Sequence, residues 1–257
     1  MTNVRIPDEM LESVVFVFRS EDAARATSAD GATGFVVEIQ APLRPAGTRY
    51  VVTCQHVVQD KDVYVRFNAR DRRGLIVHCI SQRHWHAHPN GDDISVALVD
   101  ADLYSSTVRA IPWPNGVATR KAVRSWNVGI GDDVFMLGRF LAHSAALRNQ
   151  PIARFGHIAM MPDEPVHDGR GLKVEAYLVE MLSRSGFSGS PVVVHMPAGS
   201  YRGDGRMIPF YQQNFTLLGM DVGHKELRPG EHTGMSIVTP AWKIHEALEN
   251  AGVSGVL

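Results

Sequence analysis

The sequence predicts an all-β protein made of two successive series of short strands and one terminal helix. Short apolar runs rich in β-branched and aromatic residues recur along the chain, and Pro, Gly, Asn or Asp separate them. No helical periodicity lies between the runs of the first half. Six short strands without intervening helices predict a small closed barrel in that half.

Each half of the chain contributes about six strands to this prediction. In the first half we expect strands over residues 14–18, 35–39, 50–53, 63–67, 75–80 and 94–99. In the second half we expect them over residues 134–137, 152–160, 174–181, 191–195, 215–222 and 235–238. The longer stretches 139–150 and 197–213 are predicted to be surface loops, because a hairpin needs fewer residues.

A proline-rich stretch marks the boundary between the two series. Ile111-Pro112-Trp113-Pro114-Asn115-Gly116 contains two prolines and a glycine where the first series ends. We therefore predict an N-terminal unit over 1–110, a linker over 111–120 and a C-terminal unit over 121–257.

The last unit should end in a helix. Thr239 is expected as its N-cap, Pro240 as its first residue and Gly252 as its end, around a run with helical apolar spacing.

The composition excludes several classes of partner. The 257 residues are 44% hydrophobic and carry 26 basic against 27 acidic side chains, so no net field attracts nucleic acid or an anionic membrane. No run reaches a membrane-spanning length, and the first residues lack the apolar segment of a secretory signal. Only Cys54 and Cys79 are present, which is typical of a reducing compartment. We expect a cytoplasmic protein with no nucleic-acid or membrane partner.

One turn-like stretch carries the strongest chemical signal. In Ser185-Gly186-Phe187-Ser188-Gly189-Ser190-Pro191, a small polar residue lies beside glycines and a proline fixes the exit. A turn of this kind presents a hydroxyl outward and aims backbone N–H groups at one point, as a serine nucleophile with its oxyanion hole requires. Taken alone, the motif also fits an ordinary Gly/Ser hairpin.

Two upstream stretches supply the partners that a serine nucleophile needs. The apolar run 51–58 leads to His56 as a strand ending in a histidine, and Asp92 and Asp93 open the run 94–99. The order along the chain is His, Asp, Ser. The α/β-hydrolases have Ser, Asp, His and the subtilisins Asp, His, Ser, so this order points to the chymotrypsin arrangement.

Five segments together carry a family resemblance. They are Gly31-Ala32-Thr33-Gly34-Phe35-Val36-Val37, Thr53-Cys54-Gln55-His56-Val57-Val58, His88-Pro89 before Asp93-Ile94, Gly131-Asp132-Asp133-Val134-Phe135-Met136-Leu137-Gly138, and Gly186-Phe187-Ser188-Gly189-Ser190-Pro191. In these residues and in their order, the sequence resembles the trypsin/chymotrypsin-like serine proteases, especially their bacterial, high-temperature-requirement-like branch.

The resemblance implies a fold and a site. The fold is two six-stranded antiparallel β-barrels of chymotrypsin-like type, with a C-terminal helix packed on the second barrel. The site is that of a serine endopeptidase that needs no metal or organic cofactor, with His56 as base, Asp93 orienting it and Ser188 as nucleophile. The N–H groups of Gly186 and Ser188 form the oxyanion hole, and the substrate is a protein or peptide.

The resemblance also locates the floor of the substrate pocket at Leu182, which is not acidic. Lys or Arg before the cleaved bond would leave an unpaired buried cation there, so we expect cleavage after apolar residues. Phe187 is expected to pack beneath the turn, and control of the enzyme is expected to come from its loops or from a regulatory protein partner.

Alternatives remain at several positions. Asp92 competes with Asp93, and Ser190 competes with Ser188. His84, His86 and His88 alternate as zinc ligands on one strand face would, but a solvated strand shows the same pattern. Two other functions also stay open, a catalytically silent binding scaffold and an esterase or acyl transferase.

Overall fold

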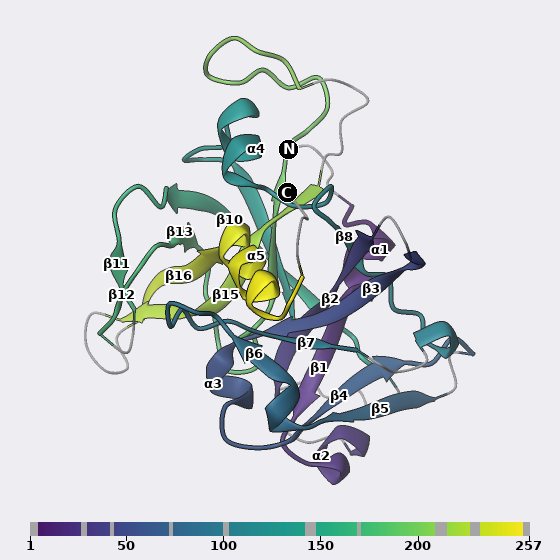
Figure 1. Ribbon diagram of the computed structural model, residues 1–257. Helices are drawn as coiled ribbons and strands as arrows, with labels where there is room; N and C mark the ends of the chain where they lie inside the picture. Colours follow the sequence, from purple (N-terminus) through teal and green to yellow (C-terminus); the bar gives the residue numbers. More distant parts are fainter. Residues whose placement is uncertain are drawn as a thin grey trace.

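The structure is a computed structural model in which two β-sheet bodies lie side by side (Figure 1). It describes residues 5–26, 30–41, 44–71, 74–99, 103–141, 148–168, 171–208, 215–226 and 232–253. Within these ranges no helix is long and apolar enough to cross a lipid bilayer.

The first half forms an eight-stranded sheet. Its strands are β1 (Val14–Phe18), β2 (Ala32–Ala41), β3 (Arg44–Thr53), β4 (Val63–Asn68), β5 (Leu75–Ile80), β6 (Trp85–Ala87), β7 (Ser95–Leu98) and β8 (Ile111–Trp113). Seven of them follow the order β5-β4-β1-β2-β3-β7-β6, and β8 pairs with β2 in parallel. The closed barrel expected here is therefore wrong. The edge strands β5 and β6 are consecutive in sequence, but the 3-10 turn Gln82–His84 separates them and β6 has only three residues.

The second half is a closed barrel, as expected. Its order is β10-β13-β16-β15-β14-β9. The strands are β9 (Asp133–Gly138), β10 (Ile152–Met160), β13 (Tyr177–Glu180), β14 (Pro191–His195), β15 (Phe215–Glu226) and β16 (His232–Pro240). The short strands β11 (Val166–His167) and β12 (Lys173–Val174) pair only with each other.

The described residues include six short helical turns that the sequence did not predict. They are α1 (Asp8–Glu12), α2 (Glu21–Arg25), α3 (Gln55–Val58), α4 (Arg120–Ser125) and the 3-10 turns Gln82–His84 and Leu103–Ser105. Ser20 caps α2 by accepting from the Ala23 N–H, and Thr119 caps α4 by accepting from the Ala122 N–H. Segments of one or two turns are too short to produce a helical repeat of apolar residues.

The stretch expected to be a linker takes part in both sheets. Ile111–Trp113 is strand β8 of the first sheet. A few residues later, the Ala118 N–H donates to the Leu217 carbonyl and the Leu217 N–H donates to the Gly116 carbonyl. The chain is thus hydrogen-bonded to β2 and then to β15 as it passes from one half to the other.

The terminal helix α5 (Ala241–Asn250) joins the two bodies instead of packing only on the second barrel. Ile244, Ala247 and Leu248 pack in one cluster with residues of β2, β3 and β7, whereas Trp242 packs in the core of the barrel. The expected cap is also wrong, because Thr239 and Pro240 still pair with β15 as the last residues of β16. Gly252 follows the helix end with a φ of +87°.

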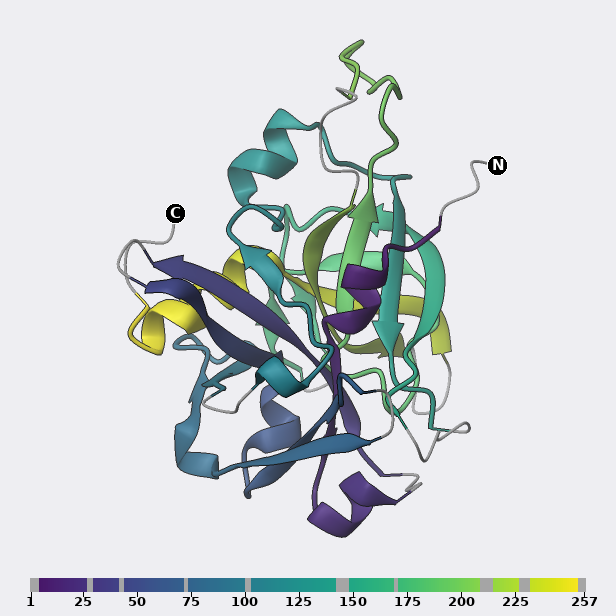
Figure 2. The same cartoon turned by 90° about the vertical axis from the view of Figure 1, so that its right-hand side faces the viewer.

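The N-terminal segment forms a second apolar contact between the halves. Met10 and Phe16 pack in one cluster with Phe135 and Leu137 of β9, and α1 lies beside the barrel strands in Figure 2. This buried apolar contact holds the two bodies together, and the candidate site lies where they meet.

Two buried arginines also lie at this contact. The guanidinium groups of Arg66 and Arg139 lie 4.8 Å and 4.6 Å from the ring centre of Phe18. Burial lowers the pKa of each to about 10. Arg139 and Asn149, near the ends of the stretch expected to be a surface loop, are buried, and residues 142–147 lie outside the described ranges.

Candidate active site

His56 lies in the one-turn helix α3. The sequence predicts instead that His56 ends a strand, and this prediction is wrong. Strand β3 ends at Thr53, and Cys54 then begins the turn. On this turn the side chain of His56 is 39% exposed. The histidine is therefore accessible from outside, which a buried strand position would not allow.

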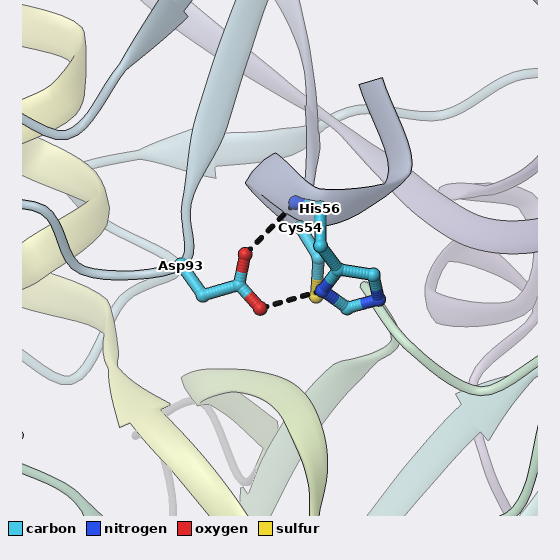
Figure 3. Close-up of side chains that lie close together, drawn as sticks. All are labelled: Cys54, His56 and Asp93. Atoms are coloured by element: carbon cyan, nitrogen blue, oxygen red, sulfur yellow. Dashed lines mark hydrogen bonds and ion pairs between the residues drawn. The ribbon is translucent and has the colours of Figure 1, made fainter. Parts of the chain in front are cut away.

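Asp93 holds His56 by two hydrogen bonds (Figure 3). The backbone N–H of His56 donates to Oδ1 at 3.0 Å, and ring atom Nδ1 lies 2.6 Å from Oδ2. The side chain of Asp93 is 6% exposed, so water screens this contact little. When Nδ1 carries the proton, Nε2 is left as the acceptor on the exposed side of the ring.

Asp92 belongs to a different network. Its Oδ2 lies 3.1 Å from Nδ1 of His88 and 3.2 Å from Nζ of Lys243 in α5, and Nε2 of His88 lies 3.0 Å from Glu246. The network anchors the turn before Asp93 to the terminal helix. Of the two aspartates, only Asp93 reaches the ring of His56.

The three alternating histidines do not come together. His84 is exposed at the end of the 3-10 turn Gln82–His84, His86 lies in β6 and His88 is buried against Asp92. Within the described residues they form no group with metal-ligand spacing.

Cys54, His56 and Asp93 do bring one sulfur, one nitrogen and one oxygen within 4.8 Å of one another. Nitrogen and oxygen ligands of one tetrahedral zinc ion are roughly 3.3 Å apart, since each lies about 2.0 Å from the metal. The 2.6 Å between His56 and Asp93 is instead the length of a charge-assisted hydrogen bond. This arrangement suits proton transfer better than metal binding.

The turn that carries Ser188 is tight and depends on glycine. Gly186 and Gly189 have φ angles of +97° and +87°, which side-chain-bearing residues rarely adopt. A Cβ on Gly189 would lie 2.1 Å from the Thr33 carbonyl oxygen. The Phe187 N–H donates to the Arg184 carbonyl, and the Ser190 N–H donates to the Phe187 carbonyl.

The two serines of the turn differ in accessibility. Ser188 is partly exposed, whereas Ser190 is fully buried and its Oγ faces the backbone of Gly138. Phe187 is also fully buried, beneath the turn as expected, and the Arg154 guanidinium lies 4.9 Å from its ring centre. Of Ser188 and Ser190, only Ser188 has an accessible side chain.

The N–H groups expected to form the oxyanion hole are available. Within the described part of the chain, neither the Gly186 N–H nor the Ser188 N–H donates a hydrogen bond. No hydrogen bond joins Ser188 to His56 either. Leu182, the expected pocket floor, is half-buried just beyond the end of β13.

Thr33 and Thr53 of the first sheet fasten the turn to the histidine segment. The Thr33 hydroxyl donates to the Gly186 carbonyl at 2.6 Å and accepts from the Arg139 N–H at 2.9 Å. The Thr33 N–H donates to the Ser188 carbonyl at 3.0 Å, and Thr53 donates to the Thr33 carbonyl at 2.7 Å. Ser188 and His56 are thus connected through β2 and β3.

These roles of Thr33 and Thr53 could not be predicted from the sequence. Thr33 lies in a glycine-containing segment that resembles a family motif, but nothing in that segment distinguishes a structural threonine from a functional one. Asp221, in the middle of β15, likewise has no sequence signal for a role at the site. Its carbonyl accepts from the Gly189 N–H at 2.9 Å and from the Cys54 thiol at 3.4 Å.

Removing the Thr33 hydroxyl should destabilise the protein. In Thr33→Val, the buried Gly186 carbonyl and Arg139 N–H lose their partner, at a cost of about 1–3 kcal/mol for each unsatisfied group. Thr33→Ser keeps the hydroxyl and is the matched control. Urea unfolding of the two variants should show a lower midpoint for valine, and equal midpoints would contradict this role.

The chain matches known proteins by its fold but not by its sequence. No family model matches the sequence, and no curated protein matches it. The fold resembles the MamO protease domain from Magnetospirillum magneticum, with a TM-score of 0.58 and 16% identity over 92% of this chain and 96% of that one.

Two further solved structures share the fold. Deg5 matches with a TM-score of 0.56 and 12% identity over 97% of this chain and 93% of that one. The HtrA-type protease AlgW, solved with a tripeptide, matches with a TM-score of 0.51 and 14% identity over 94% of this chain and 60% of that one. The chain therefore has the fold of the trypsin-like serine proteases, and the solved structures that share it include HtrA-type enzymes.

Proposed function

We propose that the protein is a serine endopeptidase that uses His56, Asp93 and Ser188. The observation that carries the proposal is the pairing of His56 with buried Asp93, together with a glycine turn in which Ser188, between Gly186 and Gly189, has an accessible side chain. The fold shared with HtrA-type proteases supports the same reaction class.

In the proposed reaction, Ser188 Oγ attacks the peptide carbonyl carbon while His56 Nε2 takes the hydroxyl proton. The carbonyl oxygen becomes an oxyanion, which the N–H groups of Gly186 and Ser188 stabilise by about 3–4 kcal/mol for each donor. The C–N bond then breaks, and His56 returns the proton to the departing amine. An acyl-enzyme remains on Ser188 until water, activated by His56, releases the acid.

Asp93 remains ionised in this scheme. Its carboxylate fixes the ring through Nδ1 and stabilises the imidazolium that forms during each proton transfer. The second hydrogen bond, from the backbone N–H of His56, prevents the carboxylate from rotating away from the ring.

A catalytically silent scaffold is the second candidate. The observation that favours it is the lack of a hydrogen bond between Ser188 and His56, both of which the structure describes. Catalytic hydrogen bonds are often long before substrate binds, so the endopeptidase remains the better-supported function.

The proposed function is tested by turnover. Purified protein is incubated with a peptide library and with matched activated esters, with Ser188→Ala as the control. We expect the unaltered protein to cleave both peptides and esters, and Ser188→Ala to cleave neither. Ester cleavage without peptide cleavage would replace the proposal with an esterase, and no cleavage of either would favour the scaffold.

The same library tests the expected specificity. With Leu182 at the pocket floor, an apolar side chain before the cleaved bond gains burial, whereas a lysine or arginine side chain would lose its hydration without a partner. We expect the cleavage sites to be dominated by apolar residues at that position. Dominant lysine or arginine would contradict the assignment of the floor to Leu182.

We further propose that the enzyme acts in the cytoplasm on proteins or peptides and that a protein partner controls it. We also propose that it binds neither nucleic acid nor a membrane. No disulfide joins Cys54 and Cys79, and Cys79 is exposed, which fits a reducing compartment. Fractionation of the producing cells tests the location, and recovery in a membrane or secreted fraction would contradict it.

A further inference from the structure

The main chain of Asp221 is hydrogen-bonded to Gly189 and Ser190, the two residues that follow Ser188 in the turn. The Gly189 N–H donates to its carbonyl at 2.9 Å, and its own N–H donates to the Ser190 carbonyl at 2.9 Å. The same carbonyl accepts from the Cys54 thiol at 3.4 Å. A displacement of Asp221 would therefore move the turn and the start of the histidine segment together.

The side chain of Asp221 is completely buried. The Ser183 hydroxyl donates to Oδ2 at 2.8 Å, while Oδ1 has no hydrogen-bond partner within the described residues. The Ser236 hydroxyl and the Gly223 N–H also face the carboxyl, but Ser236 donates its proton to the Met181 carbonyl at 2.9 Å. One carboxyl oxygen is thus left in a site that water does not reach.

Among the residues that the structure describes, no cation faces this carboxyl. The groups that surround it are the hydroxyls of Ser183 and Ser236 and the Gly223 N–H. The main-chain carbonyl of Asp221 contacts one titratable group, the Cys54 thiol. The Cys54 sulfur in turn lies within 4.8 Å of the His56–Asp93 pair. An ionised carboxylate without a partner in such a place would cost several kcal/mol.

We propose that Asp221 is a positioning residue that holds the Ser188 turn in place as an uncharged acid, and that loss of its proton sets the alkaline limit of turnover. The proposal about turnover rests on the proposed endopeptidase function. In the neutral form the carboxyl tolerates burial, and the strand keeps its hydrogen bonds to Gly189 and Ser190. In the ionised form the carboxylate is drawn toward water, and the strand that carries it pulls on the two residues that follow Ser188.

The electrostatics agree with this geometry. Burial, opposed only by the hydrogen bonds, raises the pKa of Asp221 from 3.8 to about 8. The folded protein thus binds this proton more tightly than the unfolded chain does. The contribution of Asp221 to folding stability is fully present below pH 3.8 and is lost as the pH rises to about 8.

The test compares Asp221→Asn with the unaltered full chain and with Asp163→Asn, a matched change at an exposed acid. The amide has the shape of the neutral carboxyl and cannot ionise. Above about pH 8, kcat of the unaltered protein should fall about tenfold for each pH unit, as expected for loss of one proton, and kcat of Asp221→Asn should not. Asp163→Asn should follow the unaltered protein.

A second readout does not require activity. The Tm of Asp221→Asn minus that of the unaltered protein should increase with pH up to about pH 8 and then level off. If neither protein turns over substrate and this Tm difference still appears, the endopeptidase function fails while the buried neutral acid stands. If turnover is present and both pH profiles coincide, the proposal about Asp221 is overturned.

A second variant covers the case in which Asp221→Asn does not fold. Ser183→Ala removes the one hydroxyl that donates to the carboxylate, and so removes support for the ionised form. The alkaline decline in kcat and the levelling of Tm should both move to higher pH. If the pH of the decline in kcat and the pH at which Tm levels off are both unchanged or lower in Ser183→Ala, the role of Asp221 is contradicted.

Discussion

Replacing Ser188 with alanine should lower kcat about a million-fold, and the residual rate is the one that the oxyanion hole and substrate binding support without a nucleophile. In the proposed reaction Ser188 alone supplies the attacking oxygen, and alanine at this position should leave the fold of the turn intact. Activated ester and peptide hydrolysis by purified protein measure the effect, with intact mass to exclude contamination by unaltered enzyme.

Ser190→Ala is the matched control, two residues away in the same turn. The Ser190 hydroxyl is buried against Gly138 and has no hydrogen-bond partner in the described part of the chain, so its loss should leave most activity. Equal losses in the two variants would mean that the turn, and not the Ser188 oxygen, is what the assay detects.

Asp93→Asn should lower kcat about ten-thousand-fold while leaving the fold intact. The amide is the same size as the carboxylate, but its NH₂ group favours the ring tautomer with the proton on Nε2, where Ser188 needs an acceptor. It also removes the charge that stabilises the imidazolium. Turnover and urea unfolding should be measured on the same preparation.

The control for this change is the neighbouring Asp92→Asn. Asp92 contacts His88 and Lys243 and does not reach His56. Its replacement should therefore lower the midpoint of urea unfolding and leave most of kcat. If Asp92→Asn loses as much kcat as Asp93→Asn, the orientation of His56 depends on the whole turn and not on Asp93.

Much of the strand content could be predicted because it depends on local composition. The expected strands 14–18, 75–80, 152–160 and 191–195 coincide with β1, β5, β10 and β14. Closure of the first sheet could not be predicted, because it depends on whether β5 and β6 pair across a 3-10 turn. The position of α5 likewise depends on which sheet covers Ile244 and Leu248, which the helical spacing alone does not reveal.

The candidate site was partly visible in the sequence for a similar reason. His56, Asp93 and Ser188 stand in short motifs with characteristic neighbours. Thr33 and Asp221 act through contacts with residues more than thirty positions away, namely Gly186 and Ser183. A threonine in a strand and an aspartate in a strand have no local signature for such roles, so only the structure identifies them.

Active-site labelling tests the central claim most directly. The full chain is treated with a fluorophosphonate, which reacts only with a serine activated by a neighbouring base and oxyanion hole. Intact mass should show one adduct, peptide mapping should place it on Ser188, and Ser188→Ala and His56→Ala should show none. An unlabelled chain under conditions that label a known serine hydrolase, or an adduct that persists in Ser188→Ala, would contradict the account.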